Sequence, residues 1–473
     1  MVEGPFLKIL FLNPPFGSHR PEGLDAPMGI MYLGAVLKQA GHLCSLVDHV
    51  WEKQDDWRKW DLALLGKPDG VLVNTQIRFS NETHAAMRRL RSQHPSLPAI
   101  AFGPQASTEP SRLLLEMGFD ACVIGEPEEV VPDVFRDMAG RKIILARPGI
   151  ATVENPNSGP APRVNVEKLP PPDWDLVEYG RYIQVTHSAV FMASRGLNHE
   201  DKFNQPPLIY AKQPTRRFSI ERVLRELTQL RGHFPGNYML LFHDEIFTEN
   251  RDWVIKLCAE LRRFKLRVPF WCFTRPDLID EELCRIMRRS GFVGLSMGME
   301  SASDRILGIL GKELTVSQIE RGFRSAQKAG LLTTGSVMIG TASDALGKPD
   351  EDRRELASTV RMVARLHPDV LTVTLTTPLP GTPLYESLKD KILAKSPEEF
   401  NYYHVWPGKY PLRLETLTAE DLTKTVARIR RVWKLKLWKT AWRILVLAVR
   451  NGPFRRTLFN QIAKVVKRKV LPA

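Results

Sequence analysis

Two stretches of this chain alternate short apolar runs with amphipathic segments, and this alternation constrains the fold more than any other feature. In the first stretch, the apolar runs predict strands at Lys8–Asn13, Cys44–Asp48, Gly70–Asn74, Ala99–Phe102 and Ala121–Ile124. The segments between them predict helices. Strands and helices that alternate at this spacing form a parallel sheet with helices on both faces. Residues 1–145 are therefore expected to form a doubly wound, Rossmann-like α/β domain.

The second stretch repeats the alternation six times. Its predicted strands are Val190–Ala193, Tyr238–His243, Pro269–Thr274, Val293–Met299, Thr333–Ile339 and Val370–Thr376. Six such repeats indicate a partial (β/α)6 barrel of the TIM type, in which ligands bind where the strands end. We place this barrel at residues 190–390. It follows a proline-rich linker at 146–189, whose composition predicts a stiff, extended chain.

Short motifs at the strand ends carry a family resemblance. In the first domain they are Pro27-Met-Gly-Ile-Met-Tyr-Leu-Gly34, Phe102-Gly-Pro-Gln105 and Ile124-Gly-Glu-Pro-Glu128. In the barrel they are Met297-Gly-Met-Glu-Ser-Ala-Ser303 and Thr376-Thr-Pro-Leu-Pro-Gly-Thr-Pro-Leu-Tyr385. In this order and spacing, the set resembles the cobalamin-binding radical S-adenosylmethionine (SAM) enzymes, and among them the class B methyltransferases.

The resemblance implies that cobalamin binds at the carboxyl edge of the first sheet. The residues expected to contact it are Asn13, Pro14, Phe16, Met28, Tyr32, Asp48, His49, Asn74, Thr75, Gln76, Gly103, Pro104, Gln105, Gly125 and Glu126. His49 lacks the spacing of the Asp-x-His-x-x-Gly motif that supplies a cobalt ligand in other cobalamin domains. An ordinary loop histidine is the alternative for His49, and ordinary loop residues are the alternative for the others.

The sequence departs from the family directly after Ser194-Arg195-Gly196. Family members continue with a Cys-x3-Cys-x2-Cys loop, and its thiolates bind three irons of a [4Fe-4S] cluster. The three positions here are Leu197, Asp201 and Asn204. Leucine cannot ligate iron, and aspartate and asparagine are poor substitutes for soft thiolates. We therefore expect the cluster to be absent and no other metal to be bound at these positions.

The five cysteines do not supply a substitute set of ligands. They are Cys44, Cys122, Cys258, Cys272 and Cys284, and no two of them have a metal-ligand spacing. We expect them to be small buried apolar residues of a protein in a reducing compartment.

Without a cluster, the chemistry expected of this scaffold is polar methyl transfer through cobalamin to an unknown, lipid-like or other small substrate. SAM is the expected methyl donor, and the resemblance implies Arg275 and Glu300 as its contacts. Asp244, Glu245 and Tyr385 are the catalytic candidates, since a buried carboxylate with a raised pKa can act as a general base. Two alternatives stay open. One is a non-catalytic cobalamin-binding sensor, carrier or partner subunit, and the other is cobalamin-based radical or rearrangement chemistry without SAM.

The basic charge of the chain is concentrated in its C-terminal part, residues 391–473. The net charge is +14, and no acidic residue follows Asp421, whereas residues 422–473 contain 15 Lys and Arg. Trp433, Trp438 and Trp442 lie among them in a predicted helix. This pattern indicates peripheral contact with an anionic membrane; a helix packed on the barrel is the alternative. No nucleic-acid-binding motif accompanies it, so nucleic acid is not favoured. No apolar run is long enough for a membrane span and no signal peptide is evident, so a cytoplasmic protein is expected.

Overall fold

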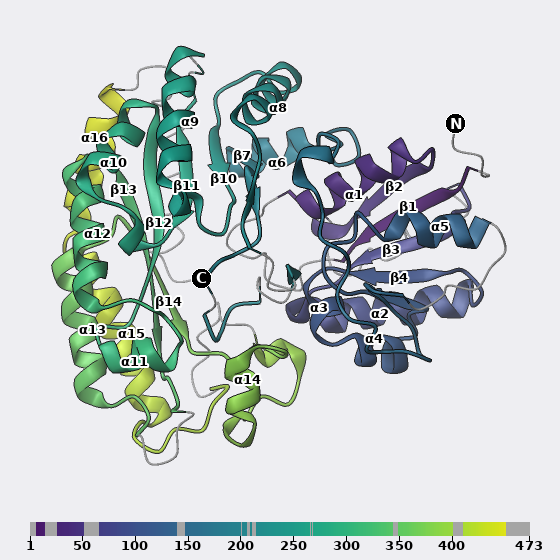
Figure 1. Ribbon diagram of the computed structural model, residues 1–473. Coiled ribbons are helices and arrows are strands. Elements are labelled where there is room, and N and C mark those ends of the chain that lie inside the picture. The colour runs from purple at the N-terminus through teal and green to yellow at the C-terminus, as the bar shows by residue number, and fades with distance from the viewer. Residues whose placement is uncertain are drawn as a thin grey trace.

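The computed structural model describes residues 6–14, 26–51, 66–139, 147–199, 201–205, 209–210, 214–264, 266, 268–343, 349–400 and 410–450. Two six-stranded sheets dominate it, one in each half of the molecule (Figure 1). The expected α/β class, with a Rossmann-like domain followed by a partial TIM-type barrel, is confirmed.

The first sheet has the strand order β2-β1-β3-β4-β5-β6. Its strands are β1 (Lys8–Asn13), β2 (Leu43–Asp48), β3 (Gly70–Asn74), β4 (Ala99–Phe102), β5 (Ala121–Val123) and the short antiparallel β6 (Ile150–Ala151). The helices α1 (Met28–Gln39) and α5 (Val131–Ala139) pack on one face. The other face is covered by α2 (Ser80–Gln93), α3 (Pro104–Thr108) and α4 (Pro110–Met117). The strand order reverses at β1, and ligands bind at such a switch point in open α/β sheets.

The second sheet is fully parallel, with the order β14-β13-β12-β11-β10-β7. Its strands are β7 (Ser188–Phe191), β10 (Met239–Phe242), β11 (Phe270–Thr274), β12 (Phe292–Glu300), β13 (Leu332–Ile339) and β14 (Val370–Leu375). The helices on its outer side are α8 (Ile220–His233), α9 (Arg251–Arg263), α10 (Glu281–Arg289), α12 (Val316–Lys328) and α13 (Arg353–Leu366). Each of these helices follows one strand and precedes the next, which is the βα repeat that the sequence predicts.

Buried ion pairs join the two halves. Arg195 belongs to β8 (Ser194–Arg195), which pairs with β9 (Arg216–Arg217). Its Nη1 lies 2.7 Å from Glu128 Oε1 and 3.3 Å from Glu126 Oε1. Arg216 Nη1 lies 2.7 Å from Glu126 Oε2. All four side chains are buried. The Ser-Arg-Gly motif therefore holds the first domain against the barrel.

Two helices extend the barrel at the C-terminal end of the described chain. The first is α15 (Ala419–Lys434), which begins at a capping box formed by Thr418 and Asp421 and packs on α13. The second is α16 (Leu437–Arg450), whose Ile444 and Leu447 pack against residues at the starts of β12 and β13. Among the described residues, no helix is long and apolar enough to cross a bilayer.

Candidate functional site

A cavity of about 520 Å³ opens at the carboxyl ends of the barrel strands. The predicted site residues that line it are Leu197, Asp201, Asn204, Glu245, Arg275 and Glu300. They come from four separate segments of the sequence, and the parallel barrel brings them together because its strands all end at one mouth. The three positions that carry cluster cysteines in the family therefore share this cavity with both predicted SAM contacts and one catalytic candidate.

Lys312 links two of these residues. Its Nζ lies 3.2 Å from Asp201 Oδ2 and 3.1 Å from Glu300 Oε1. Asn204 Nδ2 donates to Asp201 Oδ2 at 2.8 Å, and all three charged side chains are largely buried. Burial raises the pKa of Glu300, whereas the two carboxylates keep the pKa of Lys312 above its ordinary value although burial opposes this. One ammonium group thus pairs with two carboxylates, Asp201 at a position where the family has a cluster cysteine and Glu300 at the end of β12.

The backbone of β12 is shaped to bring Glu300 to this lysine. The pairing of β12 with β13 shifts register between Gly298 and Glu300, and Glu300 has a φ of +50°. A Cβ on Gly298 would lie 2.1 Å from Glu300 Oε1, so no larger residue fits there without moving the carboxylate. Left-handed backbone at a non-glycine residue is uncommon and concentrates at functional sites.

The two carboxylates that follow β10 differ in role. Glu245 lines the cavity and is exposed to it, while protein surrounds it closely enough to raise its pKa to about 7. Asp244 is buried behind the cavity wall and accepts hydrogen bonds from Ala193 N and Ser194 Oγ. Burial raises its pKa to about 6. Glu245 is therefore the carboxylate placed to exchange a proton with a bound molecule, while Asp244 fixes the end of the first barrel strand.

Arg275 and Tyr385 also occupy different positions. Arg275 lines the cavity, but its guanidinium is held by Asp277, with Nε 3.1 Å from Oδ1, and by the carbonyl oxygen of Glu313. Tyr385, on α14 (Pro383–Ser387), packs against Phe400 and is not among the residues that line the cavity. A catalytic role for Tyr385 stays a prediction without support from this geometry.

Three strand ends of the first sheet form a hydrogen-bonded chain of side chains. Asn74 Nδ2 donates to Asn13 Oδ1 at 3.1 Å, and Asn13 Nδ2 donates to Asp48 Oδ1 at 2.9 Å. Tyr182 OH, from α6 (Tyr179–Thr186), donates to Asp48 Oδ2 at 2.5 Å. Burial raises the pKa of Asp48, against the effect of these donors. The predicted residues at β1, β2 and β3 therefore do lie together at the switch point of the sheet.

The loops after β3 and β4 are hydrogen-bonded to each other beside this chain. Thr75 Oγ1 donates to the Phe102 carbonyl at 2.9 Å and accepts from Ala106 N at 3.1 Å. Gly103 has a φ of +101°, and a Cβ there would lie 2.8 Å from Asn74 Oδ1. Gln105 is buried and donates to Ser80 Oγ. Gln76 and Pro104 lie in the same two loops, and the contact of these loops with a corrin ring stays a prediction.

Other residues predicted to contact cobalamin lie elsewhere. Tyr32 and Met28 are buried in the core shared with the barrel, and the Arg195 guanidinium lies over the Tyr32 ring. Glu126 is held in the buried ion pairs with Arg195 and Arg216, and Gly125 precedes it. His49 is only 3% exposed, which leaves its ring little access to a metal. Pro14 follows β1 at the edge, and Phe16 lies outside the described residues.

The edge of the first sheet reaches the mouth of the barrel. Ile77, just after β3, packs in one apolar cluster with Leu379 and Phe400. Leu379 in turn lines the cavity. The β3 end of the first sheet, where contacts with cobalamin are predicted, and the barrel cavity are therefore neighbours.

Cysteine does not contribute to the cavity. Cys122, Cys258, Cys272 and Cys284 are buried, Cys44 is partly buried, and all five are free thiols. Burial raises the pKa of Cys258 to about 11, which disfavours the thiolate needed to bind metal. Within the described ranges, no three His, Cys, Asp or Glu side chains form a metal-binding arrangement. The donor set present does not fit an iron-sulfur cluster.

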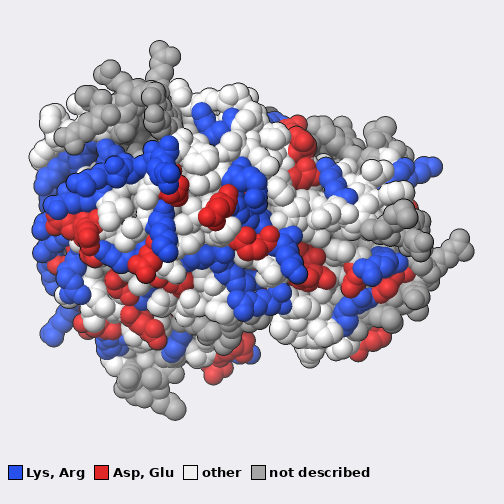
Figure 2. All heavy atoms as spheres, turned by 45° about the horizontal axis from the view of Figure 1, so that its top comes forward, with Lys and Arg blue, Asp and Glu red and all other residues white. Residues whose placement is uncertain are grey.

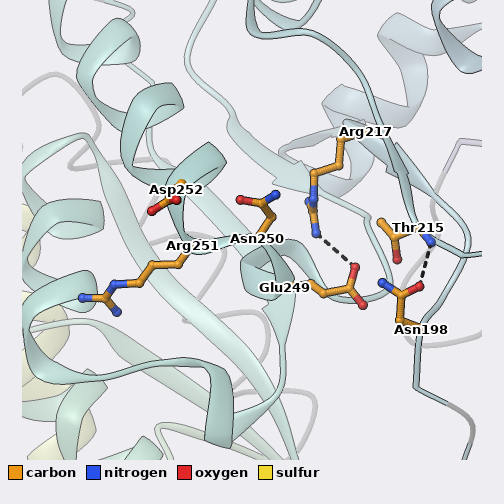
Figure 3. A pocket seen from close by; sticks show the side chains of 7 residues that line it. All are labelled: Asn198, Thr215, Arg217, Glu249, Asn250, Arg251 and Asp252. Atoms are coloured by element: carbon orange, nitrogen blue, oxygen red, sulfur yellow. Dashed lines mark hydrogen bonds and ion pairs between the residues drawn. The ribbon is translucent and has the colours of Figure 1, made fainter.

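A second hollow lies between the paired strands β8 and β9 and the start of α9 (Figure 3). Arg217 Nη2 points to Glu249 Oε2 across 3.3 Å, while Arg251 extends away from them. Arg251 is paired with Asp280 and Glu282. None of the predicted site residues lines this hollow, whereas six of them line the cavity, so we place the candidate site at the barrel mouth.

Some lining residues were not predicted from the sequence. Lys312 is the most important, and the hydroxyl side chains on the inner wall are the others: Thr274, Ser296, Thr334, Ser336, Thr372, Thr374 and Thr377. The hydroxyl residues of β13 and β14 occur at alternate positions of a strand, which is a readable signal for one common face. Lys312 lies in a loop after α11 (Asp304–Ile309), and no periodic pattern marks it.

Comparison with known proteins agrees with this architecture. Residues 204–363 match the family model of the Radical SAM superfamily. An uncharacterized methyltransferase of Pyrococcus horikoshii is 27% identical over 434 residues, which cover 89% of this chain and 91% of that protein. An anaerobic magnesium-protoporphyrin IX monomethyl ester cyclase of Rubrivivax gelatinosus is 25% identical, with coverages of 91% and 78%.

Solved structures share the fold over both domains. The radical SAM methyltransferase TsrM of Kitasatospora setae, with tryptophan and a SAM analogue bound, superposes with a TM-score of 0.71 at 17% identity, covering 90% of this chain and 89% of that one. The cobalamin-dependent SAM radical enzyme OxsB, with aqua-cobalamin and SAM bound, gives 0.70 at 14% identity, covering 99% and 76%. Residues 204–363 therefore match the Radical SAM superfamily, and the chain shares the two-domain fold of TsrM and OxsB.

Proposed function

We propose that this protein is a cobalamin-dependent methyltransferase that works by polar methyl transfer and without an iron-sulfur cluster. The observation that carries the proposal is the replacement of the cluster ligands. Leu197 offers no donor atom, and Asp201 is held by the Lys312 ammonium and the Asn204 amide. Asp201 is thus already engaged by protein donors, and a carboxylate is a poor substitute for the soft thiolate that iron of a cluster prefers. The methyltransferases among the relatives, and cobalamin in the solved neighbours, support the remainder of the proposal.

Polar methyl transfer fits this site because it needs no external electron in each turnover. The methyl group leaves the sulfonium of SAM, the electron pair of that bond stays on sulfur, and S-adenosylhomocysteine is released. The substrate forms the new bond to carbon with its own electron pair and loses one proton. Cobalamin, when bound, supplies a nucleophilic cobalt that can carry the methyl group between the two.

The chain's own residues would position the reactants and take up the proton. Asn74, Thr75, Gln76 and the Gly103–Gln105 loop would support the corrin at the edge of the first sheet. Arg275 and Glu300 would hold SAM in the barrel cavity. Glu245 is the general base, since enclosure raises its pKa to about 7 and brings it near the pH at which proton transfer is most effective.

Metal content and product analysis test the proposal together. The chain is expressed with hydroxocobalamin, purified without oxygen, and analysed for cobalt, iron and sulfide. Stoichiometric cobalt without iron is expected, and SAM should yield S-adenosylhomocysteine without 5′-deoxyadenosine. About four iron and four sulfide ions per chain would overturn the proposal that the cluster is absent. Absence of both metals would favour a protein that does not use cobalamin.

A variant of the same chain serves as the positive control. Replacing all three positions, Leu197→Cys, Asp201→Cys and Asn204→Cys, restores the Cys-x3-Cys-x2-Cys spacing on an unchanged backbone. Reconstitution with iron and sulfide should load this variant and leave the parent chain empty. Equal iron in both proteins would show that ligands other than this loop bind the metal.

A further inference from the structure

An apolar stripe runs along the outer surface of the C-terminal helices. Leu435, Trp438, Trp442 and Leu445 are 70%, 66%, 62% and 45% exposed. Trp438, Trp442 and Leu445 are spaced four and three residues apart on α16, which places them on one side of that helix, and Leu435 lies in the turn just before it. Their neighbour Trp433 is buried, and its Nε1 donates to the Pro368 carbonyl at 2.8 Å. The inner face of this segment is therefore already used for packing, and the stripe is a separate surface.

The packing of α16 explains why the stripe cannot turn inward. Ile444 and Leu447 lie against the starts of the barrel strands, and Arg443 Nη1 lies 2.6 Å from Asp369 Oδ2, just before β14. These contacts fix the rotation of the helix. Burying two tryptophans and two leucines would be strongly favourable, and no described residue covers them, so we look for a partner of this surface.

Basic side chains surround the stripe. Arg430, Arg431 and Lys434 line a shallow depression with Leu435, and the Lys439 ammonium lies over the Trp438 ring. The chain has no acidic residue after Asp421, so no carboxylate of this segment offsets these charges. Lys and Arg crowd the barrel half of the molecule (Figure 2). Tryptophan between an apolar and a cationic surface is typical of the membrane interface.

We infer that this surface, formed by Leu435, Trp438, Trp442 and Leu445 with Arg430, Arg431, Lys434 and Lys439, docks the protein on an anionic phospholipid bilayer. The apolar stripe enters the boundary of headgroups and acyl chains, and the cations contact lipid phosphates. Because α16 covers the amino ends of the barrel strands, the docked face is opposite the cavity mouth. The bilayer thus anchors the protein and does not deliver a substrate directly into the cavity.

Vesicle flotation of the full chain tests the inference, and its readout does not depend on cobalamin or methyl transfer. Vesicles of phosphatidylcholine alone are compared with vesicles containing a quarter phosphatidylglycerol. Binding to the anionic vesicles is expected, and it should weaken as salt is added. Trp438→Ala with Trp442→Ala should weaken it at least about tenfold. Arg430→Gln with Lys434→Gln should weaken it about 25-fold, since each basic residue near the surface contributes about fivefold.

Matched controls distinguish binding through this surface from nonspecific adsorption to vesicles. Leu115, on α4, is exposed to the same degree as Leu435, so Leu115→Ala should leave binding unchanged. Lys389→Gln with Arg136→Gln removes two exposed charges that lie outside this surface, one after α14 and one on α5 of the first domain, and should have a much smaller effect than the Arg430 and Lys434 pair.

Three results would overturn the inference. One is equal binding to neutral and anionic vesicles, and another is unchanged binding of the tryptophan variant with an intact circular dichroism spectrum. The third is a dimer of the parent chain, seen by analytical ultracentrifugation, that dissociates in the tryptophan variant, together with no binding of the parent chain to vesicles. That result would assign the stripe to a second copy of the chain.

Discussion

Lys312 Nζ lies 3.2 Å from Asp201 Oδ2, so a salt bridge occupies a position at which the family carries a cluster cysteine. The same ammonium contacts Glu300, and the three side chains are largely buried. A buried charge group of this kind depends on every member, because both carboxylates have lost water and share Lys312 as a cation.

Replacing Lys312 should show that the stability of the chain depends on its pairing with Asp201 and Glu300. Lys312→Met leaves Asp201 and Glu300 buried without a cation, which should lower the free energy of unfolding by about 3–5 kcal/mol at neutral pH. Burial raises the pKa of Glu300, so the folded variant binds a proton at a pH where the unfolded chain has lost it. Its stability then falls as pH rises through that pKa, and the deficit against the parent chain should shrink at about pH 5.

Urea denaturation at the two pH values checks this prediction. Lys328→Met is the matched control, because Lys328 is an exposed lysine of the same region that faces Glu281 at 3.8 Å. Its effect should stay below about 1 kcal/mol at either pH. A Lys312 variant as stable as this control would mean that the three side chains do not act as one buried group.

Glu245 should make the stability of the parent chain fall as pH rises, as in the Lys312 variant but with no side chain removed. Its pKa is raised to about 7, so the folded chain holds this proton at a pH where the unfolded chain releases it. The stability contributed by the neutral form is lost as pH rises through 7. Glu245→Gln should therefore raise the melting temperature more at about pH 8.5 than at about pH 5.5.

The same variant tests the proposed base. Methyl transfer by the parent chain should rise with pH through about 7, and the rise should be absent in Glu245→Gln. Glu116→Gln changes an exposed carboxylate in the first domain and should alter neither profile. If the Glu245 variant keeps the rise in rate, another group takes the proton.

The alternation of strands and helices was sufficient to predict both sheets. Each strand or helix has its own spacing of apolar residues, and this spacing can be read from a short stretch of sequence. The predicted strand Lys8–Asn13 has the observed bounds, and Cys44–Asp48 begins one residue late. The short strands β6, β8 and β9 were missed, since two residues carry no periodic signal.

The candidate site was predictable only in part. Leu197, Asp201, Asn204, Arg275 and Glu300 were located by motif, and the barrel brings them together. The partner that defines their chemistry, Lys312, is 111 residues from Asp201 in the chain. Tyr182, which hydrogen-bonds Asp48, comes from α6, within the stretch that the sequence suggests is a linker. Pairings over such distances are fixed by packing, which a local pattern does not contain.

Arg195 should be required for the stability of the folded chain, because it pairs with carboxylates of the first domain. Arg195→Met leaves Glu128 buried without its 2.7 Å partner, while Glu126 keeps Arg216. The variant should lose about 3–5 kcal/mol of stability, measured by denaturant unfolding, and its two domains should become separable by limited proteolysis. Combining it with Glu128→Gln should recover part of the loss, because the stranded charge is removed.

An exposed ion pair supplies the contrast for that experiment. Arg181 pairs with Glu178 at 2.8 Å with both side chains about half exposed, so Arg181→Met should change stability by less than about 1 kcal/mol. If Arg195→Met and Arg181→Met behave alike, the interdomain ion pairs do not hold the domains together.

Gly103 offers the sharpest test of the cobalamin surface. Its φ of +101° is unfavourable for any residue with a Cβ, and that Cβ would lie 2.8 Å from Asn74 Oδ1 and 3.0 Å from the Thr75 carbonyl oxygen. Gly103→Ala must therefore displace two of the loops that would support the corrin.

Gly66 is the control, because it also has a positive φ, at +84°, but a Cβ there meets nothing within 4 Å. Both variants should lose about 1 kcal/mol or more from backbone strain. Only Gly103→Ala should also lose bound cobalamin, measured as cobalt per folded chain after loading with hydroxocobalamin. Equal cobalt in the two variants would show that the cofactor binds away from the β3 and β4 loops.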